Sequence, residues 1–281
     1  DGSDINGQVW TRPTGILLGC EISLIPFSGR PSWEKITQLS LDEKLVHLRD
    51  TEFRKQLMSE TCPTKKLAGR VSNYERIFPW DGETPDYEPP ADQSIAARAK
   101  REGRDPEELV YDTLLEKDGK RILYRPLSNY AYGDLNTVAE MMKHPDTLVS
   151  LGDGGAHVGV LCDASSMAYM LTHWTRDRTR GDKVELSWAI KRITNDNAQA
   201  IGLNDRGQLK PGFKADINVI DYDRLALGYP QVAYDLPSGG RRLIQKSDGF
   251  EATIVSGVPV YRNGESTGQY PGRLVRGLQV S

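Results

Sequence analysis

The sequence of 281 residues has few cysteines and no long hydrophobic run. Its three cysteines, Cys20, Cys62 and Cys162, are odd in number and widely spaced, which argues against a disulfide framework and a cysteine metal knuckle. The longest apolar stretches, 15–20 and 147–152, are far shorter than the roughly 20 residues that cross a membrane. We therefore expect a protein of the reducing cytoplasm with no membrane partner.

Concentrated charge is also missing. The 36 basic and 39 acidic residues are scattered along the chain and leave a formal net charge of -3, so we expect no nucleic-acid partner. The four histidines form neither His-x-His nor His-Glu-x-x-His, so no zinc site with three protein ligands is recognisable. A dinucleotide fingerprint, a phosphate-binding loop and a Gly-x-Ser-x-Gly elbow are absent as well.

The sequence does contain local signals for helices and strands. With 38% hydrophobic residues, the chain can bury a large core. A capping box at Ser40 and Glu43 and a proline-led start at 105–108 each predict a helix. Further helices are expected after Asp134, over 165–174, and from Ser187 and Thr194 up to Gly202.

Two regions differ from this helical pattern. The segment 61–93 is rich in proline, glycine and isolated aromatics, and we interpret it as an ordered insertion. After Gly202 the pattern becomes β: residues 215–221 alternate, and Ser256-Gly257 lies between two short apolar runs, which predicts a hairpin. The chain also begins at Asp1 directly before a strand-like segment, so we expect earlier elements of the fold to be missing.

The segment 151–159 combines an acid, a histidine and several glycines at the end of a predicted strand, 147–152. In α/β barrels, catalytic residues lie at the carboxyl ends of the strands, which is where Asp153 falls. A carboxylate there could act as a general base, and Gly154 and Gly155 would let a substrate approach the backbone.

A structural interpretation of the same residues stays open. Asp153-Gly154 could be a turn dipeptide, and His157 a hydrogen-bonded structural histidine. His47 and His144 are expected to be structural, and His173 is expected to pack on a helix. Cys162 lies beside Asp163 without a partner, so a buried thiol is the better interpretation.

Together these residues resemble the amidohydrolase superfamily and, within it, the N-acyl-D-amino-acid deacylase (D-aminoacylase) group. A stretch of the form Gly-x-Leu-x-x-Gly-x-x-Ala-Asp, residues 207–216, is fairly specific for this group. The other segments that carry the resemblance are 12–15, 152–157, 162–165, 173–178, Thr194, Ala198, 202–203 and 235–241.

The resemblance implies an α/β fold: residues 1–203 would form the C-terminal part of a TIM-like barrel, with the insertion at 61–93. Residues 204–281 would form part of a small β-sandwich. Asp153 would activate the hydrolytic water. His157, Asp163 and the two glycines Gly154 and Gly155 would shape the site around the substrate.

The resemblance also implies a zinc cofactor. Its ligands would lie mostly in earlier barrel strands, so this chain would be a C-terminal fragment that binds zinc poorly and is inactive alone. Asp153 is the one possible ligand here. The expected substrate is a small molecule, an N-acyl D-amino acid whose amide is hydrolysed. A cyclic-amide hydrolase of the hydantoinase or dihydroorotase type and a non-catalytic scaffold are the alternatives.

Overall fold

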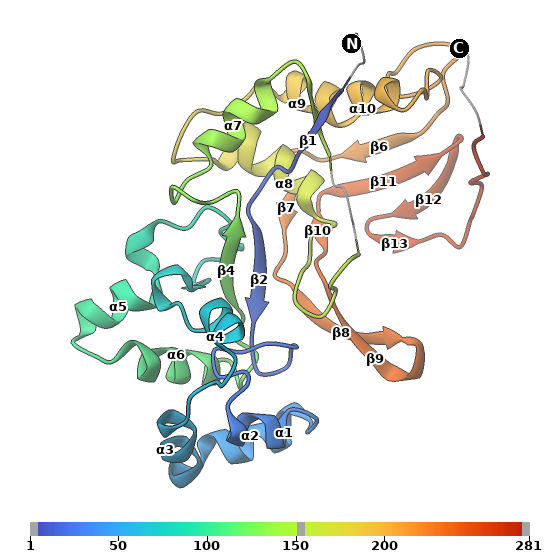
Figure 1. Cartoon of the computed structure of the whole chain (residues 1–281). Helices are drawn as coiled ribbons and strands as arrows, with labels where there is room; N and C mark the ends of the chain where they lie inside the picture. Colours follow the sequence, from blue (N-terminus) through green and yellow to red (C-terminus); the bar gives the residue numbers. More distant parts are fainter. Residues whose placement is uncertain (1–4, 151–154, 277–281) are drawn as a thin grey trace.

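The computed structural model describes residues 5–150 and 155–276 (Figure 1). It is a mixed α/β structure, as the sequence predicts. Strands β1 (Gly7–Val9) and β5 (Thr147–Val149) pair in parallel, with Gly7 opposite Thr147. They form the only parallel pair within the described residues, which therefore contain no closed barrel. The TIM-like barrel remains a prediction.

Helices cover this parallel pair. They are α7 (Asn136–Lys143), α9 (Leu186–Ile193) and α10 (Asn195–Ala200). All three were expected from the sequence, with small shifts at their ends. Asp134 lies one residue before the N-cap of α7, and its carboxylate accepts the backbone N–H of Asn136 at 2.9 Å. Strand β5 ends at Val149, earlier than predicted, and residues 151 and 152 lie outside the described residues.

A second, antiparallel sheet lies within the long connection between β1 and β5. Its order is β2-β4-β3, and Thr14 of β2 pairs with Ser128 of β4. The strands are β2 (Thr14–Leu18), β3 (Phe78–Pro79) and β4 (Leu123–Ser128). The helices beside it are α1 (Pro31–Ile36), α2 (Leu41–Arg49), α3 (Thr51–Ser59), α4 (Lys65–Val71), α5 (Ile95–Glu102) and α6 (Pro106–Leu115). Short 3₁₀ turns span Tyr74–Arg76 and Ala91–Gln93.

The helix starts in this region follow local chemistry. Ser40 and Glu43 form both bonds of the predicted capping box, and Asp105 caps α6 ahead of Pro106. Helix α4 was not expected, because the segment 61–93 lacks a long hydrophobic period. It forms because Leu67 and Val71, one helical turn apart, reach the same core.

The C-terminal part is mainly β. The predicted hairpin at Ser256-Gly257 is confirmed: both residues have positive φ, and the strands on either side pair antiparallel. The four-stranded sheet contains β6 (Ile217–Ile220), β11 (Phe250–Val255), β12 (Val258–Arg262) and β13 (Glu265–Ser266). A hairpin of β8 (Gln231–Leu236) and β9 (Gly240–Ile244) protrudes, and β7 (Ala226–Leu227) pairs with β10 (Ser247–Asp248). A 3₁₀ turn, Pro237–Gly239, joins β8 to β9.

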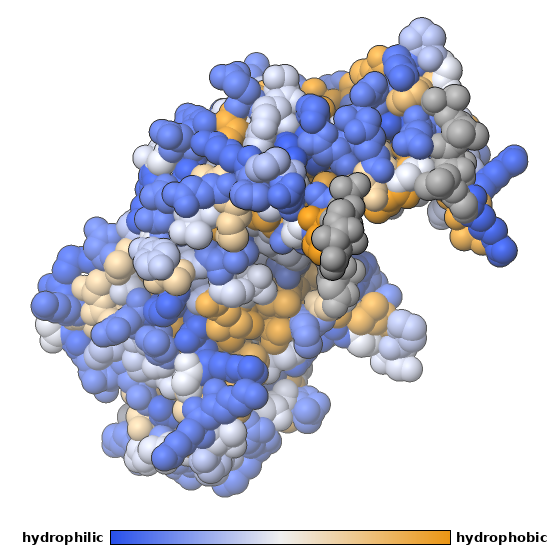
Figure 2. Space-filling model, turned by 45° about the horizontal axis from the view of Figure 1, so that its top comes forward, coloured by the Kyte–Doolittle hydropathy of each residue, from blue (hydrophilic) through white to orange (hydrophobic). Residues whose placement is uncertain are grey.

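Two hydrophobic cores hold these parts. One contains Val9 and Val149 of the parallel pair together with Leu225 and Leu243 of the β-rich part. The other lies among the helices of the connection and includes Leu18. Figure 2 shows one face of the molecule, largely hydrophilic with hydrophobic residues gathered near its middle. The β-rich part is thus packed on the same core as the strand pair, while the division at residue 203 stays a prediction.

No helix in the two described stretches is both long enough and apolar enough to span a bilayer.

Candidate functional site

The loop that follows β5 carries the site residues predicted from the sequence. Asp153 and Gly154 lie outside the described residues. Gly155 is exposed with a φ of 95°, and His157 is exposed with a φ of 50°. The carbonyl of His157 accepts the N–H groups of Val160 and Leu161, at 2.8 and 3.0 Å. In the described loop, His157 therefore shapes a turn through its backbone while its side chain faces solvent.

Asp163 has a different environment from His157. Its carboxylate is mostly buried and lies 3.4 Å from the guanidinium of Arg12, whose side chain is 1% exposed. Arg12 lies three residues after β1 and Asp163 lies fourteen residues after β5, so this ion pair connects the segment after β1 to the loop after β5. Burial raises the pKa of Asp163, and Arg12 only partly offsets that effect.

Arg12 is the centre of a polar cluster that joins these two segments. It donates to the carbonyl of Cys162 at 2.5 Å and to the hydroxyl of Ser165 at 3.3 Å. Its guanidinium lies 4.0 Å from the centroid of the Tyr87 ring. Burial raises the pKa of the Cys162 thiol to about 11, which keeps it protonated at neutral pH. The two terminal nitrogens of the guanidinium thus hold the loop after β5 through Cys162, Asp163 and Ser165.

The β-rich part contributes Gln245 to this cluster. The side-chain oxygen of Gln245 accepts the hydroxyl groups of Ser165 and Tyr87, the latter at 3.1 Å. Its amide nitrogen donates to the carbonyl of Gly228 at 2.8 Å. Gln245 therefore joins the insertion, the loop after β5 and the C-terminal strands in one network.

No role in the site was predicted for Arg12, Tyr87 or Gln245. Arg12 lies within the strand-like segment expected near the start of the chain, three residues after the end of β1, and no local pattern singled it out. Tyr87 was grouped with the aromatic anchors of the insertion, which fits its burial. Gln245 carried no local signal, because its partners are 80 and 158 positions away.

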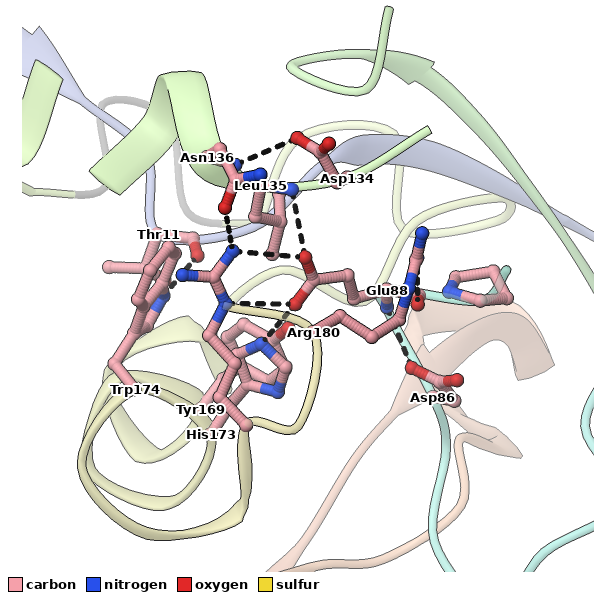
Figure 3. Close-up of polar contacts among 12 residues, drawn as sticks. Thr11, Asp86, Glu88, Asp134, Leu135, Asn136, Tyr169, His173, Trp174 and Arg180 are labelled. Carbon is pink, nitrogen blue, oxygen red and sulfur yellow. Dashed lines mark hydrogen bonds and ion pairs between the residues drawn. The ribbon is translucent and has the colours of Figure 1, made fainter. Parts of the chain in front are cut away.

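A second buried network centres on Glu88, in the insertion (Figure 3). Its carboxylate is 2% exposed and accepts two bonds from Arg178, both at 3.1 Å, and one from the backbone N–H of Leu135 at 2.9 Å. His173 Nε2 lies 2.8 Å from the same carboxylate. Burial alone would raise the pKa of Glu88, but the bonds from His173, Arg178 and Leu135 lower it to about 2.

The partners of Glu88 are held in turn by other groups. Arg178 also donates to the side chain of Asn136 at 2.9 Å. Arg180 donates to the carbonyl of Glu88 at 2.8 Å and to the Tyr130 hydroxyl at 2.9 Å. These bonds join the insertion and the start of α7 to residues 178–180, and Figure 3 shows the contacts around Glu88 and Asn136.

His173 is packed, as the sequence predicts. Its ring stacks on Tyr169 with centroids 4.5 Å apart and an interplanar angle of 12°. It ends α8 (Ser166–Thr172) and begins a π-helix, His173–Asp177. The indole of Trp174 in that π-helix donates to the carbonyl of Thr11, after β1, at 2.7 Å. The π-helix thus directs two neighbouring side chains to different partners: His173 contacts Glu88, and Trp174 contacts the segment after β1.

A pocket of about 250 Å³ lies beside this network and is lined by Asp86, Glu88 and His173, among others. Burial raises the pKa of Asp86. In the described part of the chain, no group of three or more His, Cys, Asp or Glu residues is placed to hold a metal ion. The zinc implied by the resemblance therefore has no ligand set among these residues.

Comparisons with known proteins place the chain in a family. A model of the amidohydrolase family matches residues 71–261. A search of curated proteins finds no match.

Three solved structures of D-aminoacylase are similar to the chain at low identity. The first, described as defining a novel subset of amidohydrolases, has 22% identity and a TM-score of 0.37 over 63% of this chain and 33% of that chain. A mutant in complex with copper chloride has 21% identity and a TM-score of 0.41 over 74% of this chain and 39% of that one. The third, from work on the binuclear metal centre, has 20% identity and a TM-score of 0.38, with 69% and 36% covered.

The chain thus spans 33–39% of the length of these three structures. The family match covers well over half of the chain. The chain belongs to the amidohydrolase family.

Proposed function

We propose that the chain is part of a hydrolase that cleaves the amide bond of an N-acyl D-amino acid, with Asp153 as the general base. The observation that supports this is the position of Asp153 in the chain. It follows β5 by four residues, and β5 pairs in parallel with β1, which is followed by Arg12 and its cluster. In barrel hydrolases the reacting groups lie at the carboxyl ends of the strands.

The proposed chemistry needs one proton relay. Asp153 would take a proton from the attacking water and pass it to the leaving nitrogen as the carbon–nitrogen bond breaks. The products are a carboxylate from the acyl group and a free amino acid. Arg12 and Asp163 would hold the loop behind Asp153, while Gly154, Gly155 and His157 would border the substrate.

The finer parts of the proposal come from the resemblance of the motifs to the D-aminoacylase group. They are the D configuration, the linear amide and the zinc cofactor. No zinc ligands are assigned to the described residues.

The test is Asp153→Asn in the complete gene product that contains this sequence, with N-acetyl-D-amino acids as substrates. Loss of a general base should lower kcat by roughly 10²- to 10⁴-fold. The matched control is Asp146→Asn, because Asp146 is exposed and lies just before the opposite end of β5. Full activity of the Asp153 variant would show that the base is another residue.

Substrate comparison separates the proposal from its alternatives. Preference for an N-acetyl-D-amino acid over its L enantiomer and over a hydantoin supports the deacylase. Faster hydrolysis of the hydantoin would instead support a cyclic-amide hydrolase. A complete gene product that hydrolyses none of them would favour the scaffold.

A further inference from the structure

A pocket of about 500 Å³ lies away from the Arg12 cluster. It is bordered by residues 19–22, which follow β2, by residues 117–122, between α6 and β4, and by residues 229–232 before and within β8. Strand β2 starts two residues after Arg12 and runs away from it. Its five residues span about 17 Å at the usual rise of a strand, so this pocket and the Arg12 cluster lie at opposite ends of β2.

Basic side chains dominate the charge of this pocket. Lys117, Lys120 and Arg121 line it, and Glu21 is the acidic residue of the lining. Arg121 is neutralised by Asp81, with which it forms a short ion pair, and by Glu116 at 3.4 Å. We call this cavity the lysine pocket.

The two lysines differ from Arg121 in having no acidic partner. Within residues 5–150 and 155–276, neither Lys117 nor Lys120 lies within 4.0 Å of a carboxylate. The ammonium of Lys117 lies 5.3 Å from the centroid of the Tyr229 ring. The Glu21 carboxylate accepts the hydroxyl of Tyr234 at 3.1 Å. The pocket therefore carries two lysines without a paired carboxylate, and with Glu21 these three side chains leave one net positive charge at its edge.

The wall behind these charges is apolar. Ile22 and Trp80 are buried, and Ile122 and Val232 are partly buried. The volume is within the usual range of small-ligand sites, which combine apolar walls with a few placed polar groups.

The backbone that carries the lysines has an uncommon shape. Lys117, Asp118 and Gly119 all have positive φ, at 52°, 53° and 73°. A Cβ on Gly119 would lie 2.6 Å from a methyl group of Leu45, so the turn packs closely on α2. The turn fixes Lys117 and Lys120 on either side of this glycine, next to the apolar wall.

We propose that the lysine pocket binds a small carboxylate with an apolar body, such as an aromatic acid. The carboxylate would pair with the ammonium groups of Lys117 and Lys120. The body would cover Ile22, Ile122 and Val232. The proposal does not depend on the proposed hydrolase activity, because none of the residues that line the pocket has a role in the proposed reaction.

The first experiment compares three probes by NMR titration of the full-length protein that contains this chain. Benzoate carries both features, acetate has only the head group, and benzamide has only the ring with an uncharged polar group. We expect benzoate to bind at least about tenfold more tightly than either of the others. Equal binding of acetate would reduce the pocket to a general anion site, and equal binding of benzamide would remove the role of the lysines; either result overturns the proposal.

The second experiment places the binding at these side chains. The double variant Lys117→Gln/Lys120→Gln should weaken benzoate about tenfold or more, and Lys120→Gln alone should give part of that loss. Lys143→Gln, an exposed lysine at the end of α7, is the matched control and should bind as the parent protein does. Unchanged affinity in both pocket variants, with unchanged thermal unfolding, would place the ligand elsewhere and contradict the proposal.

Discussion

The two buried ion pairs near the loop after β5 differ in how completely they are satisfied. Glu88 accepts three hydrogen bonds from Arg178 and Leu135, has His173 Nε2 at 2.8 Å, and has a pKa of about 2. Asp163 has one long contact to Arg12, at 3.4 Å, and a raised pKa. The Glu88 carboxylate is thus held by several bonds that connect separate segments of the chain. The Arg12–Asp163 pair is the less completely bonded of the two.

The largest expected effect is on the Glu88 network. Glu88→Gln leaves Arg178 buried at 1% exposure without its counter-charge. Removing one partner of such a pair typically destabilises a protein by about 3–5 kcal/mol. Urea unfolding should show this loss, whereas Glu83→Gln, at an exposed position of the same insertion, should change stability by less than about 0.5 kcal/mol. A small loss of stability in Glu88→Gln would mean that the two ion pairs stabilise the fold to a similar degree.

The pH dependence of stability should also separate the two carboxylates. The folded pKa of Glu88 is lowered to about 2, so its stabilisation is present above its unfolded pKa of about 4.3 and is lost as the pH falls through 2. This shift corresponds to about 3 kcal/mol. Asp163 has the opposite sign, because its raised pKa favours the folded state at low pH and that contribution is lost as the pH rises.

Unfolding measured between pH 5 and pH 2 checks this prediction. The parent protein should lose more stability over that interval than Glu88→Gln does. Parallel curves for the two proteins would contradict the low pKa of Glu88.

A smaller effect is expected for Asp163→Asn. The contact to Arg12 is long, and Arg12 keeps its bond to the Cys162 carbonyl. We expect a loss of about 1–2 kcal/mol because the buried Arg12 loses its counter-charge, and relief of the buried carboxylate's own desolvation keeps this loss below that of Glu88→Gln. A loss as large as that of Glu88→Gln would show that the Arg12–Asp163 pair stabilises the fold as strongly as the Glu88 network does.

The smallest effect is expected for Gln245→Ala. It removes the acceptor of the Ser165 and Tyr87 hydroxyl groups, but Ser165 also has the Cys162 carbonyl at 3.3 Å. The expected loss is about 1 kcal/mol, because one hydroxyl can turn to another acceptor. Gln199→Ala, at an exposed position of α10, is the control in the same unfolding assay.

Local features of the fold were predictable from the sequence. The capping box at Ser40 and the turn at Ser256-Gly257 are confirmed because each depends on residues within a few positions. The sheet β2-β4-β3 was not predicted. Thr14 and Ser128 pair across more than a hundred residues, and no local pattern encodes such a partner.

The candidate site shows the same limit. Asp153 and Asp163 were selected because they follow one predicted strand, and the role of Asp153 stays a prediction. Arg12 was quoted only as part of a motif, since its value depends on Asp163 and Tyr87 lying beside it in space. The Glu88 network was missed because its charges look like ordinary surface charges in the sequence.

The register of the parallel pair has a consequence for how the chain folds. Thr147 lies 140 positions after Gly7, and all of β2, β3, β4 and helices α1 to α7 lie between them. During synthesis β1 emerges before β5 and cannot pair with it until this whole connection has been made. The antiparallel sheet and its helices can therefore form before β1 docks. Closing so long a loop is slow. A connection that has already folded brings its two ends closer together, so that β1 and β5 find each other sooner.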